Sequence, residues 1–167
     1  ARVLPWREDT AAYRVWVSEI MLQQTRVEAV KPFFERFIKA LPDVQALSEA
    51  PEDELLKLWE GLGYYNRVRN MQKAARVIVS EYGGDFPADY EKLLSLPGLG
   101  HYTAGAVSSI AFGIPMPAVD GNVLRVLSRV TASYEDVLKQ SVKTAMEAEV
   151  KNILPADRAG DFNQALI

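Results

Sequence analysis

Apolar residues recur every three to four positions along almost the whole chain, and this spacing constrains the fold more than any other feature of the sequence. The run Tyr13, Trp16, Val17 and Ile20, for example, places its apolar side chains on one face of a helix. Alternation of apolar and polar residues, which is typical of strands, is scarce. Because glycine and proline interrupt the pattern at short intervals, we predict an all-α protein built from many short helices.

Polar and glycine residues between the apolar runs indicate where the helices begin and end. Asp43 and Asp120 precede apolar runs as N-cap residues do, and Gly83 follows a long run as a helix C-cap does. We therefore expect helices at about residues 13–22, 27–40, 44–49, 51–59, 66–82, 89–95, 102–113, 120–129, 137–153 and 157–167. The last run reaches Ile167 without a capping residue, so we expect the natural protein to continue beyond it.

The composition excludes several kinds of site. The chain has no cysteine and one histidine, His101, so its own residues cannot supply a disulfide, a thiolate zinc site, a cysteine-held iron–sulfur cluster or a multi-histidine metal centre. The uncharged stretch 93–119 is interrupted by Pro97 and Pro115, which leaves too little uninterrupted helix to span a membrane. A net charge of −3 argues against bulk attraction to nucleic acid but leaves room for a local contact.

The segment 96–100, Leu-Pro-Gly-Leu-Gly, predicts a tight turn between two helices. Its two glycines allow a sharp turn, and the unpaired N–H groups at the start of the next helix can bind a phosphate without any lysine. A plain corner between two helices is the alternative. Candidate cations for such a contact are Arg67, Arg69, Lys73, Arg76, Arg125 and Arg129.

Glu19 is the first candidate for acid–base chemistry. Helical spacing places it on the same face as Val15 and Trp16, where loss of water favours the neutral, proton-donating form of a carboxyl group. The alternative is a glutamate at the edge of the helix that pairs with Arg14 or Arg26.

Asp120 is the second candidate. As an N-cap it would only begin a helix, but Gly121 beside it allows a ligand to approach and Asn122 supplies an amide. A proton donor and an ionised carboxylate together are what the cleavage of a glycosidic bond requires. Glu19 and Asp120 are therefore candidates for such a pair.

Six segments, taken in order along the chain, closely resemble the MutY-type adenine DNA glycosylases of the helix-hairpin-helix superfamily. These segments are 4–7 (LPWR), 18–25 (SEIMLQQT), 59–65 (WEGLGYY), 96–105 (LPGLGHYTAG), 119–123 (VDGNV) and 162–166 (FNQAL). The resemblance covers essentially the whole chain. It implies an enzyme of base-excision repair that removes adenine mispaired with 8-oxoguanine or guanine from duplex DNA.

The resemblance also implies two helical lobes with the active-site cleft between them. Residues 7–116 would form a six-helix barrel that carries Glu19 and includes the hairpin at about 89–113. Residues 1–6 and 117–167 would form the second lobe. The adenosine would be flipped out of the duplex into the cleft.

By the same resemblance, Glu19 would protonate adenine N7 and Asp120 would stabilise, or transiently bond, the sugar cation before water adds. Tyr102 and Asn122 would assist around Asp120. The residues implied to enclose the adenine are Arg2, Trp6, Arg7, Gln164 and Ile167. Those implied to contact the DNA are Leu22, Gln24, Thr25, Leu62, Tyr64, Gly98, Gly100, His101 and Thr103. Of the two neighbouring tyrosines, Tyr64 is expected at the DNA and Tyr65 in the core.

Tyr102 distinguishes two members of the superfamily. The endonuclease III relatives carry a lysine there, whose amine attacks the sugar and leads to strand cleavage. A phenol cannot form a Schiff base, so we predict a monofunctional glycosylase. An endonuclease III-like glycosylase and lyase is the alternative enzyme, and a non-catalytic DNA-binding fragment is the alternative from another class.

Relatives in this family usually continue into four cysteines that hold a [4Fe–4S] cluster and into a C-terminal domain that reads 8-oxoguanine, although forms without the cluster exist. Because the chain ends inside a helix, we expect a truncated chain rather than such a form, with the cluster held by cysteines downstream of Ile167 and no metal within the chain itself. The expected partner is double-stranded DNA with an A:8-oxoguanine or A:G mispair. We expect a monomer in the bacterial cytoplasm, associated with the nucleoid, and no membrane contact.

Overall fold

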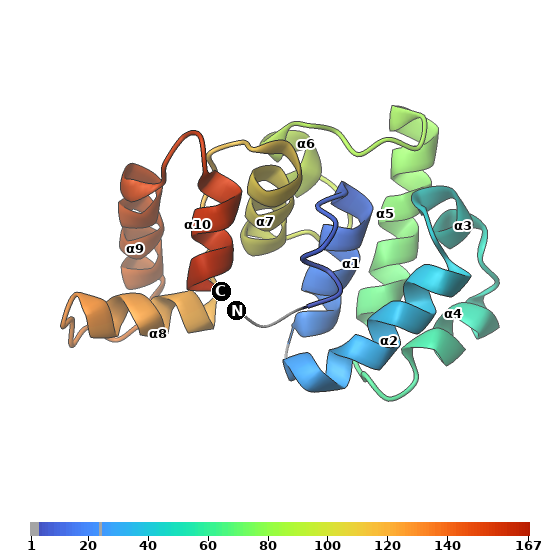
Figure 1. The fold of residues 1–167 in the computed structure, drawn as a ribbon, viewed down its shortest axis with the longest axis horizontal. Coiled ribbons are helices and arrows are strands. Elements are labelled where there is room, and N and C mark those ends of the chain that lie inside the picture. Colours follow the sequence, from blue (N-terminus) through green and yellow to red (C-terminus); the bar gives the residue numbers. More distant parts are fainter. Residues whose placement is uncertain (1–3, 24) are drawn as a thin grey trace. The chain divides into compact units, whose positions relative to one another are not determined.

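A computed structural model of the chain describes residues 4–23 and 25–167, and these residues form ten α-helices and no strand, which confirms the all-α prediction (Figure 1). The helices are α1 (Ala12–Leu22), α2 (Val27–Ala40), α3 (Val44–Glu49), α4 (Glu52–Trp59), α5 (Asn66–Tyr82), α6 (Tyr90–Leu94), α7 (His101–Phe112), α8 (Gly121–Val130), α9 (Gln140–Ile153) and α10 (Ala159–Leu166). None of these helices is long and apolar enough to cross a membrane.

The chain divides into two compact units, Ala1–Leu99 and Gly100–Ile167. The first contains α1 to α6 and the second contains α7 to α10. The boundary falls inside the glycine-rich turn between α6 and α7. The expected division into lobes at residue 116 stays a prediction.

Aromatic side chains form the centre of the first unit. On α2, Phe34 and Phe37 face inward together with Val30, in the i, i+4, i+7 spacing of an amphipathic helix. The rings of Phe37 and Trp59 meet edge to face with their centroids 5.9 Å apart. The ring of Trp16 on α1 is likewise fully buried.

Two buried polar side chains pair with backbone carbonyls in the first unit. The hydroxyl of Tyr13 donates to the carbonyl of Leu41 at 2.6 Å, and burial raises the pKa of this phenol. The Gln72 amide on α5 donates to the carbonyls of Leu47 (3.1 Å) and Ala50 (2.7 Å). These bonds satisfy carbonyls at the ends of α2 and α3, which would otherwise be unpaired.

The core of the second unit is aliphatic. It lies between α8, α9 and the segment before α8, and α10 packs on both α7 and α8. Its buried members are Val119, Val123, Leu124, Leu127, Val142, Met146 and Val150.

The helix ends agree with the expected caps, with two exceptions. Asp43 accepts a hydrogen bond from the backbone N–H of its helix, and Gly83 ends α5 in the left-handed conformation. Helix α9, however, begins at residue 140 rather than 137, because Asp136 forms a turn in which its carboxylate accepts from the Leu138 N–H at 2.9 Å. Helix α10 begins at residue 159 rather than 157, because a turn from 155 to 158 precedes it.

Two glycines of the second unit permit very close packing. A Cβ atom at Gly105 on α7 would lie 2.0 Å from the carbonyl oxygen of Pro117, so the backbones of α7 and of the segment before α8 are in direct contact. A Cβ atom at Gly160 on α10 would lie 2.7 Å from the carbonyl oxygen of Ser109. Any side chain at either position has to displace backbone.

We expect Gly105→Ala to lower the free energy of unfolding by about 1–3 kcal/mol, because the added methyl group would overlap the Pro117 carbonyl. Gly121→Ala is the matched control: its Cβ would meet only the end of the Arg125 side chain, at 3.4 Å, so a change within about 0.5 kcal/mol is expected. Urea unfolding of the full-length protein measures both. Equal effects of the two substitutions would contradict the close contact.

Candidate functional site

Glu19 lies on α1 among apolar side chains. Its exposed fraction is 6%, and its neighbours Trp16 and Ile20 are also buried. The carboxyl group is therefore largely removed from water, as its place on the apolar face led us to expect. Arg14, one of the alternative partners, ion-pairs with Asp9, with 3.6 Å between Nε and Oδ2.

Asp120 caps α8 and is held in one orientation. Its Oδ1 accepts from the backbone N–H groups of Asn122 (2.9 Å) and Val123 (2.8 Å), and its Oδ2 accepts from the Asn122 side-chain amide at 3.1 Å. Arg125 in turn donates to the side-chain oxygen of Asn122. The N-cap interpretation is thus confirmed, and the half-buried carboxylate keeps a fixed direction.

Each carboxyl group belongs to a different unit, Glu19 to the first and Asp120 to the second. The expectation that they face a common cleft stays a prediction. The same holds for the adenine pocket. Trp6 is buried in the first unit, where its ring meets that of Phe34 edge to face, while Gln164 and Ile167 are half-buried in the second. Arg7 is exposed, and Arg2 lies outside the described residues.

Arg67 on α5 is held by backbone carbonyl groups. Its Nη1 donates to the carbonyl of Ile20 at 2.8 Å and also to that of Gln23, and its Nη2 donates to the carbonyl of Leu62 at 3.3 Å. Burial lowers the pKa of the guanidinium, and the Tyr64 phenol acts in the opposite direction. We call this set of bonds the Arg67 clamp; it joins the end of α1 to the loop 60–65.

The Arg67 clamp corrects an expectation, because Arg67 is committed to carbonyl groups rather than presented to a phosphate. Its sequence position held a signal for this role. Arg67 is four residues before Met71, which in turn is seven residues before Ile78, so it lies on the buried face of α5. A cation on an apolar face needs internal acceptors.

Tyr64 projects from the loop next to the clamp. Its backbone is left-handed, with φ at 50°, and Gly63 before it has φ at 70°. Such a conformation costs a tyrosine of the order of 1 kcal/mol, and it is typical of functional sites. The ring is 68% exposed and stacks over the Arg67 guanidinium, with Cζ 5.5 Å from the ring centroid.

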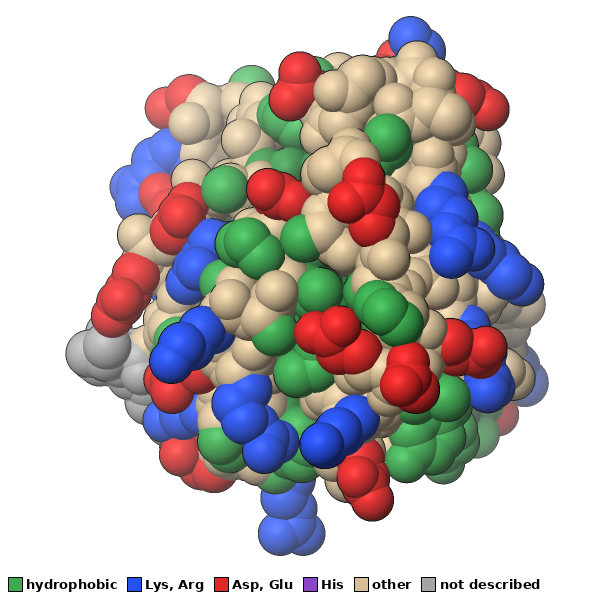
Figure 2. All heavy atoms as spheres, turned by 90° about the vertical axis from the view of Figure 1, so that its right-hand side faces the viewer, with side chains coloured by type: hydrophobic (Ala, Val, Ile, Leu, Met, Phe, Trp, Pro, Cys, Tyr) green, Lys and Arg blue, Asp and Glu red, His purple; other side chains and the backbone are tan. Residues whose placement is uncertain are grey.

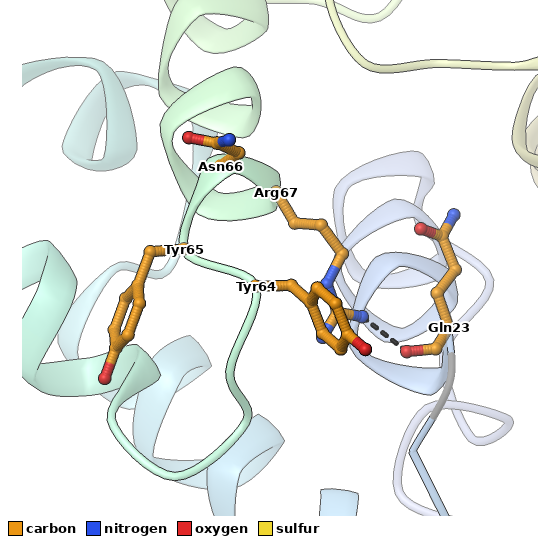
Figure 3. A pocket seen from close by; sticks show the side chains of 5 residues that line it. All are labelled: Gln23, Tyr64, Tyr65, Asn66 and Arg67. Atoms are coloured by element: carbon orange, nitrogen blue, oxygen red, sulfur yellow. Dashed lines mark hydrogen bonds between the residues drawn. The ribbon is translucent and has the colours of Figure 1, made fainter.

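A surface pocket of about 590 Å³ lies at this loop, lined by Gln23, Tyr64, Tyr65, Asn66 and Arg67 (Figure 3). In Figure 3 the Tyr64 ring lies beside Arg67 and Gln23, and the Tyr65 ring points away from them. Tyr65 is 37% exposed, so it is less buried than expected of a core residue.

The other residues predicted to contact the DNA differ in their exposure to solvent. Leu22 and Thr25 are half-buried, Leu62 is buried, and Gln24 lies outside the described residues. The Thr25 N–H donates to the Leu22 carbonyl at 3.3 Å, which continues the turn at the end of α1.

The glycine-rich turn is described in two parts, one in each unit. In the first unit, Gly98 has φ at 79°, and a Cβ there would lie 2.8 Å from Cβ of Asn70. In the second unit, Gly100 is the N-cap of α7 and has no side chain to cap it. The side chain of His101 is exposed. Thr103 is only 1% exposed, so a contact between Thr103 and DNA would have to come from its backbone.

Most candidate cations already have partners. Arg69 ion-pairs with Glu52 at 3.0 Å, and Arg76 donates to the Ser48 carbonyl at 3.2 Å. Figure 2 shows Lys and Arg interspersed with Asp and Glu over the face that is turned to the viewer. That face therefore carries no extended patch of positive charge, which agrees with the net charge of −3. In the described part of the chain, no group of His, Asp and Glu is placed to hold a metal ion.

Comparison with known proteins identifies a family. The family model of the HhH-GPD superfamily base excision DNA repair proteins matches residues 17–152. An adenine DNA glycosylase of Buchnera aphidicola subsp. Baizongia pistaciae is 40% identical over 166 residues, which are 99% of this chain and 47% of that protein. An adenine DNA glycosylase of Mus musculus is 46% identical over 173 residues, which cover 98% of this chain and 34% of that protein. The chain thus spans less than half the length of these curated relatives.

Solved structures agree in fold. A thermostable thymine-DNA glycosylase matches with a TM-score of 0.86 and 28% identity, over 99% of this chain and 76% of that chain. An endonuclease III in a non-covalent complex with DNA matches with a TM-score of 0.80 and 27% identity, over 93% of this chain and 72% of that chain.

We expect Arg67→Met to lower the free energy of unfolding by about 1–3 kcal/mol, because three carbonyl groups lose a charged donor. Arg69→Met is the matched control, since it breaks only an exposed ion pair, and less than about 1 kcal/mol is expected. Urea unfolding of the full-length protein measures both. A stability of Arg67→Met equal to that of the control would contradict the clamp.

Proposed function

The chain belongs to the HhH-GPD superfamily of base excision DNA repair proteins, and we propose that it carries the catalytic part of a DNA glycosylase that removes adenine mispaired with 8-oxoguanine or guanine. Its similarity to curated adenine DNA glycosylases over nearly its whole length carries this proposal. The burial of Glu19, the fixed carboxylate of Asp120 and the exposed ring of Tyr64 support it.

In the proposed reaction, Glu19 donates a proton to adenine N7. A carboxyl group with little access to water favours its neutral form, which makes it a suitable donor. Protonation withdraws electrons from the bond between N9 and the sugar C1′. The electron pair of that bond leaves with the adenine, and a positive charge develops on the sugar.

Asp120 then stabilises the positive charge on the sugar until water adds at C1′. The added water gives up one proton, which restores the neutral form of Glu19, and an abasic site remains. Three hydrogen bonds keep its carboxylate from rotating, so little reorganisation is needed when the charge develops. Asn122 supplies two of those bonds and is a positioning residue in this scheme. Tyr102, half-buried in the first turn of α7, has no amine that can attack the sugar, so the enzyme is proposed to be monofunctional.

Tyr64 is proposed to contact the duplex where the base is extruded. An aromatic ring can stack on a base of any sequence, and the stacking offsets part of the energy that unstacking the duplex requires. The neighbouring pocket at Gln23 and Asn66 offers polar groups to the opposite base.

A [4Fe–4S] cluster does not fit the residues of this chain, because the chain has no cysteine. A cluster in the full-length protein would take its ligands from elsewhere, and no step of the proposed reaction passes through it. Monomeric action and association with the nucleoid remain predictions.

The function is tested with the full-length protein on a duplex that contains one adenine opposite 8-oxoguanine, followed by alkali to cleave abasic sites. We expect strand cleavage only after alkali. Glu19→Gln should lower the single-turnover rate at least about 100-fold, because it removes the proton donor, and Asp120→Asn should also lower it severely. Strand breaks of comparable rate without alkali would favour an endonuclease III-like lyase, and no abasic product at all would overturn the proposal.

We expect Tyr64→Gly to weaken binding of the mispaired duplex by about 5- to 150-fold, because one stacking ring is lost. The free energy of unfolding should stay within about 1 kcal/mol, since glycine relieves the left-handed backbone but adds freedom to the unfolded chain. Tyr134→Ala, which removes a fully exposed ring far along the chain from this pocket, should change affinity less than about twofold by comparison. Fluorescence anisotropy and urea unfolding measure the two quantities. Equal loss of affinity in both variants would contradict the role of Tyr64.

A further inference from the structure

Asn163 is a fully buried polar side chain in the middle of α10, with an exposed fraction of 0%. Its Oδ1 accepts from the backbone N–H of Ala118 at 3.3 Å. Its Nδ2 donates to the hydroxyl of Ser109 at 2.8 Å and to the carbonyl of Met116 at 2.9 Å. A buried amide with this number of partners fixes the elements that supply them.

These bonds join three parts of the second unit: α10, the last turns of α7, and the segment 113–120 that leads to α8. Gly160 brings the first two together, because it lies one turn before Asn163 and packs directly on the backbone at Ser109. The Ser109 hydroxyl in turn donates a hydrogen bond to the carbonyl of Ala106 at 3.4 Å. Asn163 therefore reaches the segment from a helix that is itself locked to α7.

The segment runs back along α7 towards its first turn. It leaves the end of α7 with the Ile114 N–H bonded to the Ser108 carbonyl at 3.0 Å. Asn163 then holds the backbone on either side of Pro117, and the Pro117 carbonyl lies against Gly105. Asp120 follows three residues later, in extended conformation, so its position depends on where this segment is held.

The residue after Asn163 is Gln164, which is half-buried on the same helix. Because the Asn163 amide fixes α10 about its own axis, it also fixes the direction in which Gln164 projects. One buried amide thus constrains both the segment before Asp120 and a residue expected at the adenine.

We propose that Asn163 is a positioning residue for adenine excision, which sets the place of Asp120 and Gln164 relative to α7. The inference rests on the proposed glycosylase function. Asn163 touches no reacting atom in this scheme and acts through Ala118 and Met116. A displacement of about 1 Å at a reacting group can lower a rate about 100-fold, so loosening this segment should affect the chemical step.

A purely structural role makes a different prediction. If Asn163 only stabilised the fold, its loss would reduce the fraction of folded, active molecules and leave the rate of each active molecule unchanged. A positioning role lowers the rate constant of the active molecules themselves. Active-site titration gives the fraction, and single-turnover kinetics gives the rate constant, so the two roles can be separated.

The experiment compares full-length wild type with Asn163→Ala, Ser109→Ala and the control Asn152→Ala, whose side chain is exposed on α9. The substrate is the duplex with adenine opposite 8-oxoguanine. We expect the single-turnover rate constant per active molecule to fall about 10- to 100-fold in Asn163→Ala. In Ser109→Ala the rate constant should fall by a smaller factor, because the two hydrogen bonds between Asn163 and the segment 113–120 remain. Asn152→Ala should match wild type.

A rate constant of Asn163→Ala equal to that of wild type, whatever its active fraction, would overturn the proposal. If Asn163→Ala does not fold, Asn163→Ser and Ser109→Ala decide in its place, and unchanged rate constants in both would overturn it. A wild type that releases no adenine would instead refute the proposed function, so the two failures are distinguishable.

Discussion

Backbone groups at helix ends must find partners when they are buried, and much of this structure follows from that requirement. Arg67 supplies three donors where α1 ends and the loop 60–65 passes. Asn163 supplies one donor, its Nδ2 group, and one acceptor, its Oδ1 atom, to the segment that leads from α7 to α8. In both places a side chain distant in sequence ties an irregular segment to a helix.

The candidate site residues lie beside these ties. Ile20, whose carbonyl is bound by Arg67, is next to Glu19 in sequence, and Leu62 is two residues before Tyr64. Ala118, bound by Asn163, is two residues before Asp120. The groups proposed to react or to contact DNA therefore lie next to backbone that is hydrogen-bonded by a side chain from another element, which limits their movement.

Local patterns in the sequence predict all ten helices and the caps at Asp43, Asp120 and Gly83, but they place the starts of α9 and α10 two to three residues too early. Asp43, Asp120 and Gly83 act at helix ends through neighbours a few residues away, so their roles are readable without a fold. Arg67 was expected at DNA. Its place on the apolar face of α5 indicated internal acceptors, but those acceptors lie up to 47 residues earlier, and only the folded chain shows which they are. Asn163 was missed for the same reason, since its partners are 45 to 54 residues away.

The ring of Tyr64 lies over the Arg67 guanidinium, and this contact favours one orientation of an otherwise exposed side chain. A flexible side chain loses rotational freedom when a ligand covers it, and that loss weakens binding. A ring that already has a favoured orientation loses less of this freedom. The loop therefore presents an aromatic ring in a favoured orientation. Binding of a ligand to this ring should cost less conformational entropy than the exposure of the ring alone would suggest.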